Sequence, residues 1–385
     1  MGKPSKSVRC REDGRRAPRR DPERVQGIIL VITGRTADVF VLIVGYRNSA
    51  DIEECLAALS RSSVKPTFDV FICENGGADA YAQLIDELVG ADGPCELTQD
   101  HVASDELKSG RLVDVRHLRF RARASNVWIG CARENLGYAG GINAWLHHLL
   151  PIPGWKGIWI LNPDTEPQPN ALAALIERAE TGGKGMIGST VLEAGQMDHI
   201  RFRGGIHWQR FAGRGIAIGL GDRLDRPHDL PAIESAMDSP SGSSMYVTRS
   251  CIETVGPMDE SYFLFFEDLD WGMRAKASGL GYASKSVVGH KRGTSTGSAR
   301  SPAAIPRLSV YLEHRNGIHF VRRHFPWTLP VRIAVSFLYA LRFLINGAPK
   351  NFLVTLEGVF AGLRGEIGRP AWHRQLSGDP RTRQF

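Results

Sequence analysis

Paired cysteines are missing from this sequence. Its six cysteines are scattered along the chain, and no two of them have the Cys-x-x-Cys spacing. Zinc sites and disulfide frameworks need clustered or paired cysteines, so the distribution argues against both. Scattered cysteines are typical of proteins kept in a reducing compartment, and we therefore expect a cytoplasmic protein.

Positive charge is scarce outside the N-terminus. The chain carries a net charge of +7, but nine basic and four acidic residues before Val25 supply +5 of it. The rest is close to neutral, which argues against a nucleic-acid-binding protein. That class rests on the basic tail alone, so removal of residues 1–36 would abolish its binding.

A secretory signal core is also missing, because the apolar run 27–33 is short and no small-residue cleavage site follows it. We expect residues 1–36 to be a disordered basic tail or the product of a start codon placed too early. Contact of this tail with anionic lipid is an alternative.

The rest of the chain alternates between short apolar runs and amphipathic helical segments, which predicts an α/β fold with a largely parallel sheet. The predicted strands are 39–44, 68–73, 113–118, 127–131, 158–161, 186–191 and 279–288. The predicted helices among them are 51–60, 80–88, 144–150, 169–179 and 268–278.

One stretch, Ile158 to Pro167, reads as a buried strand stopped by Asn162 and Pro163. Asp164 then lies just past the carboxyl end of the strand, where ligands bind in open α/β sheets. A carboxylate in a turn more often caps a helix. A functional role for Asp164 is therefore supported only together with the two stretches described next.

A glycine-rich segment, 133–143, runs into the helix 144–150. Its glycines allow close backbone approach, and a helix N-terminus is suited to an anion. The glycine spacing in this segment matches neither the dinucleotide-binding fingerprint nor a Walker loop. Alone, the segment favours a glycine-rich turn.

Aromatic residues lead directly into three carboxylates between Tyr262 and Arg274. Like charges so close together repel, unless a cation or substrate compensates them or one caps a helix. An aromatic wall also excludes water and tunes a carboxylate for general base catalysis. His290, at the end of the next strand, fits a metal ligand, although a lone histidine is more often structural.

Two further regions are less regular. Residues 195–235 show little periodicity, and we expect a long loop that contributes to acceptor binding. Trp327 to Leu344 is strongly apolar, but Arg332 and Arg342 leave too short a run between them to span a bilayer. An interfacial amphipathic helix and a helix packed on the core are equally supported there.

In this order, the motifs resemble those of the family 2 glycosyltransferases, within them the rhamnosyltransferase-like branch. The resemblance spans about 39–325. It implies a GT-A fold, a Rossmann-like domain that binds a nucleotide sugar, and an inverting reaction with a divalent metal ion. We expect the boundaries 1–36 (tail), 37–300 (GT-A domain), 301–364 (helical extension) and 365–385 (polar tail).

The resemblance also implies roles for individual residues. Asp268 is the catalytic base and Glu267 belongs to the same acidic pair. Asp164 is the main metal ligand and His290 a further one, with Mg²⁺ or Mn²⁺ as the ion. Glu74 stands where relatives usually carry Asp. The positions at the nucleotide sugar are Val44, Tyr46, Asn48, Glu74, Asn135, Gly137, Asn143 and Asn162.

The sequence therefore predicts transfer of a sugar, rhamnose from dTDP-rhamnose, to a cell-surface glycan or lipid-linked acceptor. The same chemistry with a UDP-hexose or UDP-galactofuranose donor is the nearest alternative. A nucleotide-binding protein without catalysis is the alternative from another class. We expect no nucleic-acid partner, and peripheral contact with the inner face of the plasma membrane.

Overall fold

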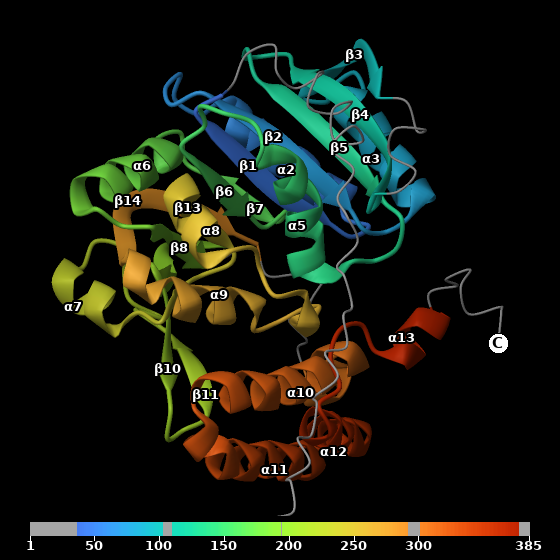
Figure 1. Cartoon of the computed structure of the whole chain (residues 1–385), viewed down its shortest axis with the longest axis vertical. Coiled ribbons are helices and arrows are strands. Elements are labelled where there is room, and N and C mark those ends of the chain that lie inside the picture. The colour runs from blue at the N-terminus through green and yellow to red at the C-terminus, as the bar shows by residue number, and fades with distance from the viewer. Residues whose placement is uncertain (1–36, 103–109, 194, 292–300, 377–385) are drawn as a thin grey trace, which may run out of the picture.

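The computed structural model describes residues 37–102, 110–193, 195–291 and 301–376, and Figure 1 shows their arrangement. The expectations for the tail 1–36 and for residues 377–385 lie outside this part. An α/β body occupies one end of the molecule, and three stacked helices close to the C-terminus lie beneath it in the view of Figure 1.

The body is built on a mixed sheet of eleven strands with a parallel centre. β1 (Val39–Gly45) pairs in parallel with β2 (Phe68–Glu74) and β6 (Gly157–Leu161), and β2 pairs in parallel with β5 (Asn126–Ala132). Every residue of β1 and β2 is buried, as expected for apolar runs in a parallel sheet.

Strands of both directions extend the sheet on both sides of this centre: β3–β4, β4–β5, β13–β6, β13–β8 and β14–β7 are antiparallel pairs, and β8–β14 is a parallel pair. On one side β5 pairs with β4, and β4 pairs with β3. On the other side β13 lies between β6 and β8, followed by β14 and β7. These strands are β3 (Cys95–Val102), β4 (Leu112–Phe120), β7 (Thr165–Pro167), β8 (Met186–Glu193), β13 (Ser244–Thr248) and β14 (Leu280–His290).

Helices cover both faces of the sheet, and a separate apolar cluster lies between the sheet and the helices on each face. On one face lie α2 (Ser49–Ser60), α3 (Ala78–Val89) and α6 (Ala171–Gly182). On the other face lie α5 (Gly137–Leu149), α8 (Arg249–Val255) and α9 (Glu267–Ala275). The predicted Rossmann-like α/β fold with a helical C-terminal part is confirmed.

Two predictions about local structure are wrong. The region 195–235 is folded: β9 (Gln196–Arg203) pairs with β8, β10 (Gly205–Gln209) and β11 (Arg214–Ala217) form a hairpin, and α7 (Leu230–Ala236) follows. Helix α5 begins at Gly137 rather than at 144, because the glycine-rich motif itself forms its first turns.

The C-terminal part consists of α10 (Arg307–His324), α11 (Leu329–Ile345), α12 (Pro349–Arg364) and the short α13 (Ala371–Leu376). Helix α10 packs against the body through a cluster of aromatic and aliphatic side chains that includes Phe266 and Phe320. Figure 1 shows α11 and α12 on the far side of α10, away from the sheet.

Candidate active site

Three central strands end at one edge of the sheet. Gly45 at the end of β1 pairs with Glu74 at the end of β2, and Ile43 pairs with Leu161 at the end of β6. Asn162 follows Leu161 directly, so the predicted nucleotide-sugar positions and the predicted metal ligands lie along this edge.

The turn after β1 carries two of the predicted residues. Tyr46 is exposed, and its backbone N–H donates to Asn48 Oδ1 at 2.9 Å. Val44 is buried beneath the glycine-rich motif: a Cβ on Gly141 would lie 2.8 Å from a Val44 methyl group. Val44 therefore supports this motif rather than facing the strand ends.

Glu74 is buried and built into the turn that follows β2. Its Oε1 accepts the backbone N–H of Gly76 at 2.7 Å and of Arg47 at 3.1 Å. Burial raises the pKa of this carboxyl, and the two N–H groups offset part of the rise. The longer side chain fits because residue 45 is glycine, where a Cβ would lie 2.5 Å from Glu74 Oε2.

Asn75 was not predicted as a site residue, but it joins this turn to the glycine-rich motif. Its Oδ1 accepts the Leu136 N–H at 3.2 Å, and its Nδ2 donates to Gly137 O at 3.0 Å. Asn135 adds a third hydrogen bond, because its Oδ1 accepts the Gly137 N–H at 2.9 Å. Two asparagines thus fix the start of α5.

The motif ends in a residue that the structure places differently from the prediction. Asn143 is 1% exposed, and its Nδ2 donates to Met258 O at 2.9 Å and Glu260 Oε1 at 2.8 Å. These contacts tie α5 to the segment before α9. The geometry therefore gives Asn143 an anchoring role, and its predicted contact with the nucleotide stays a prediction.

The predicted metal ligands lie together. Asp164 Oδ1 is 3.3 Å from His290 Nε2, and Asn162 Nδ2 is 3.4 Å from the same nitrogen. β7 and β14 create this meeting, since Thr165 and His290 are paired across them. Asp164 and His290 are each 7% exposed, and His290 Nδ1 is buried without a hydrogen-bond partner.

This donor set is small for a metal site. No group of three or more His, Cys, Asp or Glu that could hold a metal ion occurs in the described ranges. Mg²⁺ is commonly held by one or two carboxylates together with phosphate oxygens and water. One carboxylate and one imidazole at a strand end therefore fit an ion shared with a substrate diphosphate.

The acidic pair begins α9 and points to the same region. Asp268 Oδ1 accepts the Leu269 N–H at 2.8 Å, and Oδ2 accepts the Gly242 N–H at 3.1 Å. Burial raises the pKa of Asp268, and these N–H groups offset part of the rise. Burial and the neighbouring Asp268 raise the pKa of Glu267 to about 8.

Tyr138 connects the acidic pair with the predicted metal ligands. Its hydroxyl lies 2.8 Å from Gly242 O and 3.1 Å from Asn162 Oδ1. Burial, followed by the charges of nearby carboxylates including Asp268 and Asp164, raises the pKa of this phenol, so it stays a neutral donor. The glycine-rich motif contained this signal, but Tyr138 was not among the predicted site residues.

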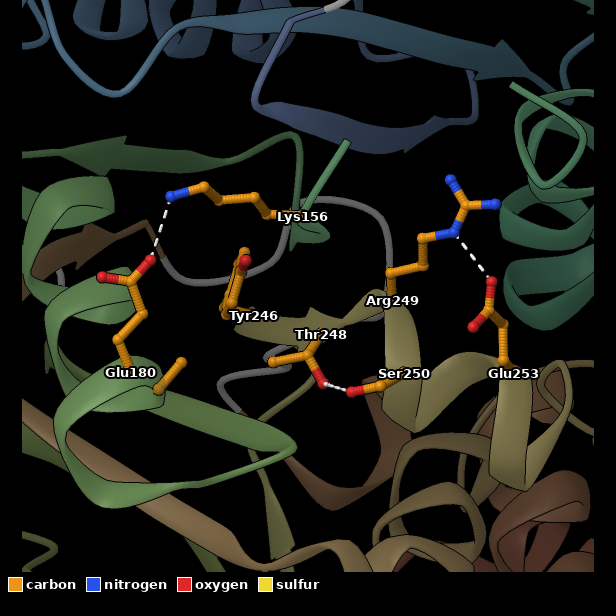
Figure 2. A pocket seen from close by; sticks show the side chains of 8 residues that line it. Lys156, Glu180, Tyr246, Thr248, Arg249, Ser250 and Glu253 are labelled. Atoms are coloured by element: carbon orange, nitrogen blue, oxygen red, sulfur yellow. Dashed lines mark hydrogen bonds and ion pairs between the residues drawn. The ribbon is translucent and has the colours of Figure 1, made fainter. Parts of the chain in front are cut away.

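Two hollows lie at the opposite edge of the sheet and contain none of the predicted residues. Figure 2 shows one of them, lined by Lys156, Tyr246 and Arg249, with Lys156 paired to Glu180 at 3.0 Å and Arg249 to Glu253 at 2.7 Å. Both basic side chains of this hollow are therefore compensated by carboxylates of its own lining.

Comparison with known proteins bears on the resemblance. No protein-family model matches the sequence. The chain is 27% identical over 348 residues to the N-acetylglucosaminyl-diphospho-decaprenol L-rhamnosyltransferase of Mycobacterium tuberculosis, covering 83% of this chain and 97% of the relative. It is 22% identical over 251 residues to the low-salt glycan biosynthesis hexosyltransferase of Haloferax volcanii, covering 61% and 75%.

Among solved structures, a mannosyltransferase from Pyrobaculum calidifontis in complex with GDP-Man and Mn²⁺ superposes with a TM-score of 0.45 at 10% identity, covering 90% of this chain and 94% of that one. The curated relatives are named as sugar transferases. The predictions of an enzyme and of its class, a glycosyltransferase, are confirmed.

Proposed function

We propose that this glycosyltransferase is an inverting, metal-dependent enzyme that transfers rhamnose from dTDP-rhamnose to a lipid-linked glycan acceptor. One observation carries the mechanism: the acidic pair is joined by hydrogen bonds, through Gly242, Tyr138 and Asn162, to the Asp164–His290 pair. The relative from Mycobacterium tuberculosis supports the donor sugar and the diphospho-lipid acceptor by its name.

The donor diphosphate lies at the strand ends beside Asp164 and His290. Asp164 and His290 would hold a divalent ion there, which would supply positive charge to offset the negative charge of the leaving diphosphate. Asp164 supplies the hard oxygen that Mg²⁺ and Mn²⁺ prefer. Tyr138 keeps Asn162 in place beside these two ligands, because its hydroxyl contacts the Asn162 amide oxygen.

Asp268 acts on the acceptor as general base. The acceptor oxygen attacks the anomeric carbon on the face opposite the diphosphate and gives its proton to the Asp268 carboxylate. The bonding pair leaves with the diphosphate oxygen, so the anomeric configuration inverts. Burial and the neighbouring Asp268 raise the pKa of Glu267 to about 8, whereas two backbone N–H groups stabilise the Asp268 carboxylate, so Asp268 is the better base.

We assign the approach of the lipid-linked acceptor to the C-terminal helices. Helix α11 buries a stripe of Arg332, Ser336 and Ala340 but exposes apolar side chains on its other side. Together with α12 it presents an exposed apolar face, made by Trp327, Phe337, Leu338, Leu341, Leu344, Ile345, Leu353 and Phe360. Exposed apolar surface of this extent marks an interaction site.

The positive charge of the C-terminal part supports a lipid surface as the binding partner of this apolar face. Residues 301–385 hold twelve Lys or Arg and four Asp or Glu, a net charge of +8, whereas residues 37–300 sum to −7. A basic helix pair with an apolar face suits an anionic membrane surface. By length and composition, Pro326–Ile345 is one candidate membrane span, with 22% of its window buried. We assign it to the interface because α11 packs along α12.

The donor is tested by thermal shift with dTDP-rhamnose, UDP-glucose, UDP-galactose, UDP-galactofuranose and GDP-mannose, with and without Mn²⁺. We expect a metal-dependent shift with dTDP-rhamnose. A shift with a UDP sugar alone would replace the donor, and a shift that ignores Mn²⁺ would remove the metal from the proposal.

Asp164→Ala tests the metal ligand. Loss of the carboxylate weakens metal-dependent donor binding about 10- to 100-fold. Glu166→Ala is the matched control, since Glu166 lies two residues further along and is half exposed. Titration of donor binding against Mn²⁺ compares the two variants, and equal metal dependence in both contradicts the role of Asp164.

Flotation with vesicles tests the apolar face. We expect the wild-type chain to float with phosphatidylglycerol vesicles and less with phosphatidylcholine vesicles. Leu338→Glu, at 64% exposure on α11, should reduce flotation, whereas Val64→Glu, at 83% exposure on the body, should not. A wild-type chain that stays in solution with both vesicles rules out the lipid surface.

A further inference from the structure

The loop that leads into the acidic pair has an unusual backbone conformation. Phe263, Phe265 and Phe266 have φ values of 66°, 68° and 74°. This left-handed region is disfavoured for residues with a Cβ, and it persists only where surrounding contacts impose it. Glu267 follows Phe266 directly as the first residue of α9, so the loop determines where the acidic pair lies.

Helix α10 supplies these contacts through two neighbouring side chains. Asn316 Nδ2 donates to three loop carbonyl oxygens, those of Tyr262 at 2.9 Å, Leu264 at 2.8 Å and Phe265 at 3.0 Å. Arg315 holds the amide in orientation, because its Nε donates to Asn316 Oδ1 at 2.9 Å. Both side chains are 1% exposed.

The other side of the loop meets the glycine-rich motif. The backbone N–H of Tyr138 donates to Phe263 O at 2.8 Å. A Cβ on Gly137 would lie 2.1 Å from the same oxygen, so only glycine allows this approach. The loop is therefore held between the donor side of the site and helix α10.

We propose that Asn316, oriented by Arg315, is a positioning residue that sets the place of the Asp268 carboxylate. The proposal rests on the proposed function, in which Asp268 takes the acceptor proton. An amide is needed at this position because it donates two hydrogens to carbonyl oxygens that converge on one point. An aspartate of the same shape has no hydrogen to donate, and its charge repels the carbonyl oxygens.

A matched asparagine separates positioning from anchoring. Asn351 on α12 is also buried, and its Nδ2 donates to the carbonyl oxygens of Pro302 at 2.7 Å and Ile305 at 3.2 Å. It makes the same kind of bond to a turn, but that turn leads to no site residue. Asn351→Asp therefore measures what the loss of such an anchor does to the fold alone.

The experiment compares Asn316→Asp and Asn351→Asp for Tm, for kcat and donor KM, and for hydrogen exchange of residues 262–270. We expect both variants to lower Tm, while only Asn316→Asp lowers kcat, by about 10- to 100-fold, with donor KM unchanged. We also expect exchange at 262–270 to rise on the order of tenfold in Asn316→Asp alone. Should that variant not fold, Asn316→Ser keeps one donor and serves the same comparison.

The outcomes separate this inference from the proposed function. Unchanged hydrogen exchange at 262–270 in the Asn316 variant shows that Asn316 does not hold the loop, and it overturns the inference whichever donor sugar the enzyme uses. Faster exchange with unchanged kcat shows that the contacts of Asn316 with the loop do not position the base, and it overturns the inference as well. A wild-type chain without turnover on any donor contradicts the proposed function, and exchange then still decides whether Asn316 holds the loop.

Discussion

The carboxylates of helix α9 occupy opposite environments although they lie within four residues. Asp270 is fully buried beside two arginines and a histidine: its carboxylate oxygens lie 2.8 Å from Arg274 Nε, 2.7 Å from His324 Nε2 and 3.3 Å from Arg323 Nη1. Burial alone would raise the pKa of Asp270, but these hydrogen bonds and charges lower it.

Glu267 is buried and Asp268 is partly buried, yet only backbone N–H groups offset the loss of water around them, and the pKa of each is raised. A carboxylate removed from water without a cation is costly, so its presence needs a reason other than stability. The difference indicates that Asp270 anchors the helix through its pair with Arg274, while the acidic pair before it is left without cations.

The largest expected effect comes from Asp268→Asn, which keeps the shape and one acceptor oxygen for the backbone N–H groups but removes the base. We expect kcat to fall about 10³-fold, because general base catalysis contributes 10²- to 10⁴-fold. Nucleotide affinity should stay close to that of the wild type, and thermal shift with the donor measures it. Turnover that survives would move the base to Glu267.

Asp270→Asn should affect stability instead. It leaves Arg274 and Arg323 without their buried anion, which lowers the free energy of unfolding by about 3 kcal/mol. Glu253→Gln is the control: its pair with Arg249 has the same i,i+4 spacing on a helix, but Glu253 is 54% exposed, so the loss should stay below ~0.5 kcal/mol. Urea unfolding compares the two, and equal losses would contradict the assignment of Asp270 as the anchor.

The sequence predicted much of this site, because its residues follow strands that are easily recognised. The apolar runs of β1, β2 and β6 end in turns that carry Glu74 and Asp164, and the carboxyl ends of parallel strands meet at one edge. The acidic pair was visible because three carboxylates in four residues are unusual after a run of aromatic residues.

The rest depended on contacts between distant segments. Asn316 looks like a polar residue on a helix, and nothing near it in the chain indicates carbonyl oxygens some fifty residues earlier. The same applies to Asn143, whose partner Glu260 lies 117 residues further along the chain. The region 195–235 lacked periodicity because its strands are short and those of the hairpin are partly exposed.

The smallest expected effect comes from Glu267→Gln, and it depends on pH. With a pKa of about 8 in the folded state against 4.5 for the ordinary carboxyl, Glu267 holds a proton that the unfolded chain releases between these values. The folded state therefore binds more protons in this window, and the wild-type free energy of unfolding falls as pH rises from about 5 to 8. Glutamine mimics the protonated carboxyl and has nothing to release, so the variant should gain on the wild type by about 1–3 kcal/mol across this range. Urea unfolding at pH 5 and pH 8 measures the difference, and catalysis at neutral pH should be nearly unchanged. If the free energy of unfolding depends on pH in the same way in the wild type and in Glu267→Gln, Glu267 is ionised in the folded state. Glu267 and Asp270 would then both be charged, and a difference in charge would no longer distinguish them.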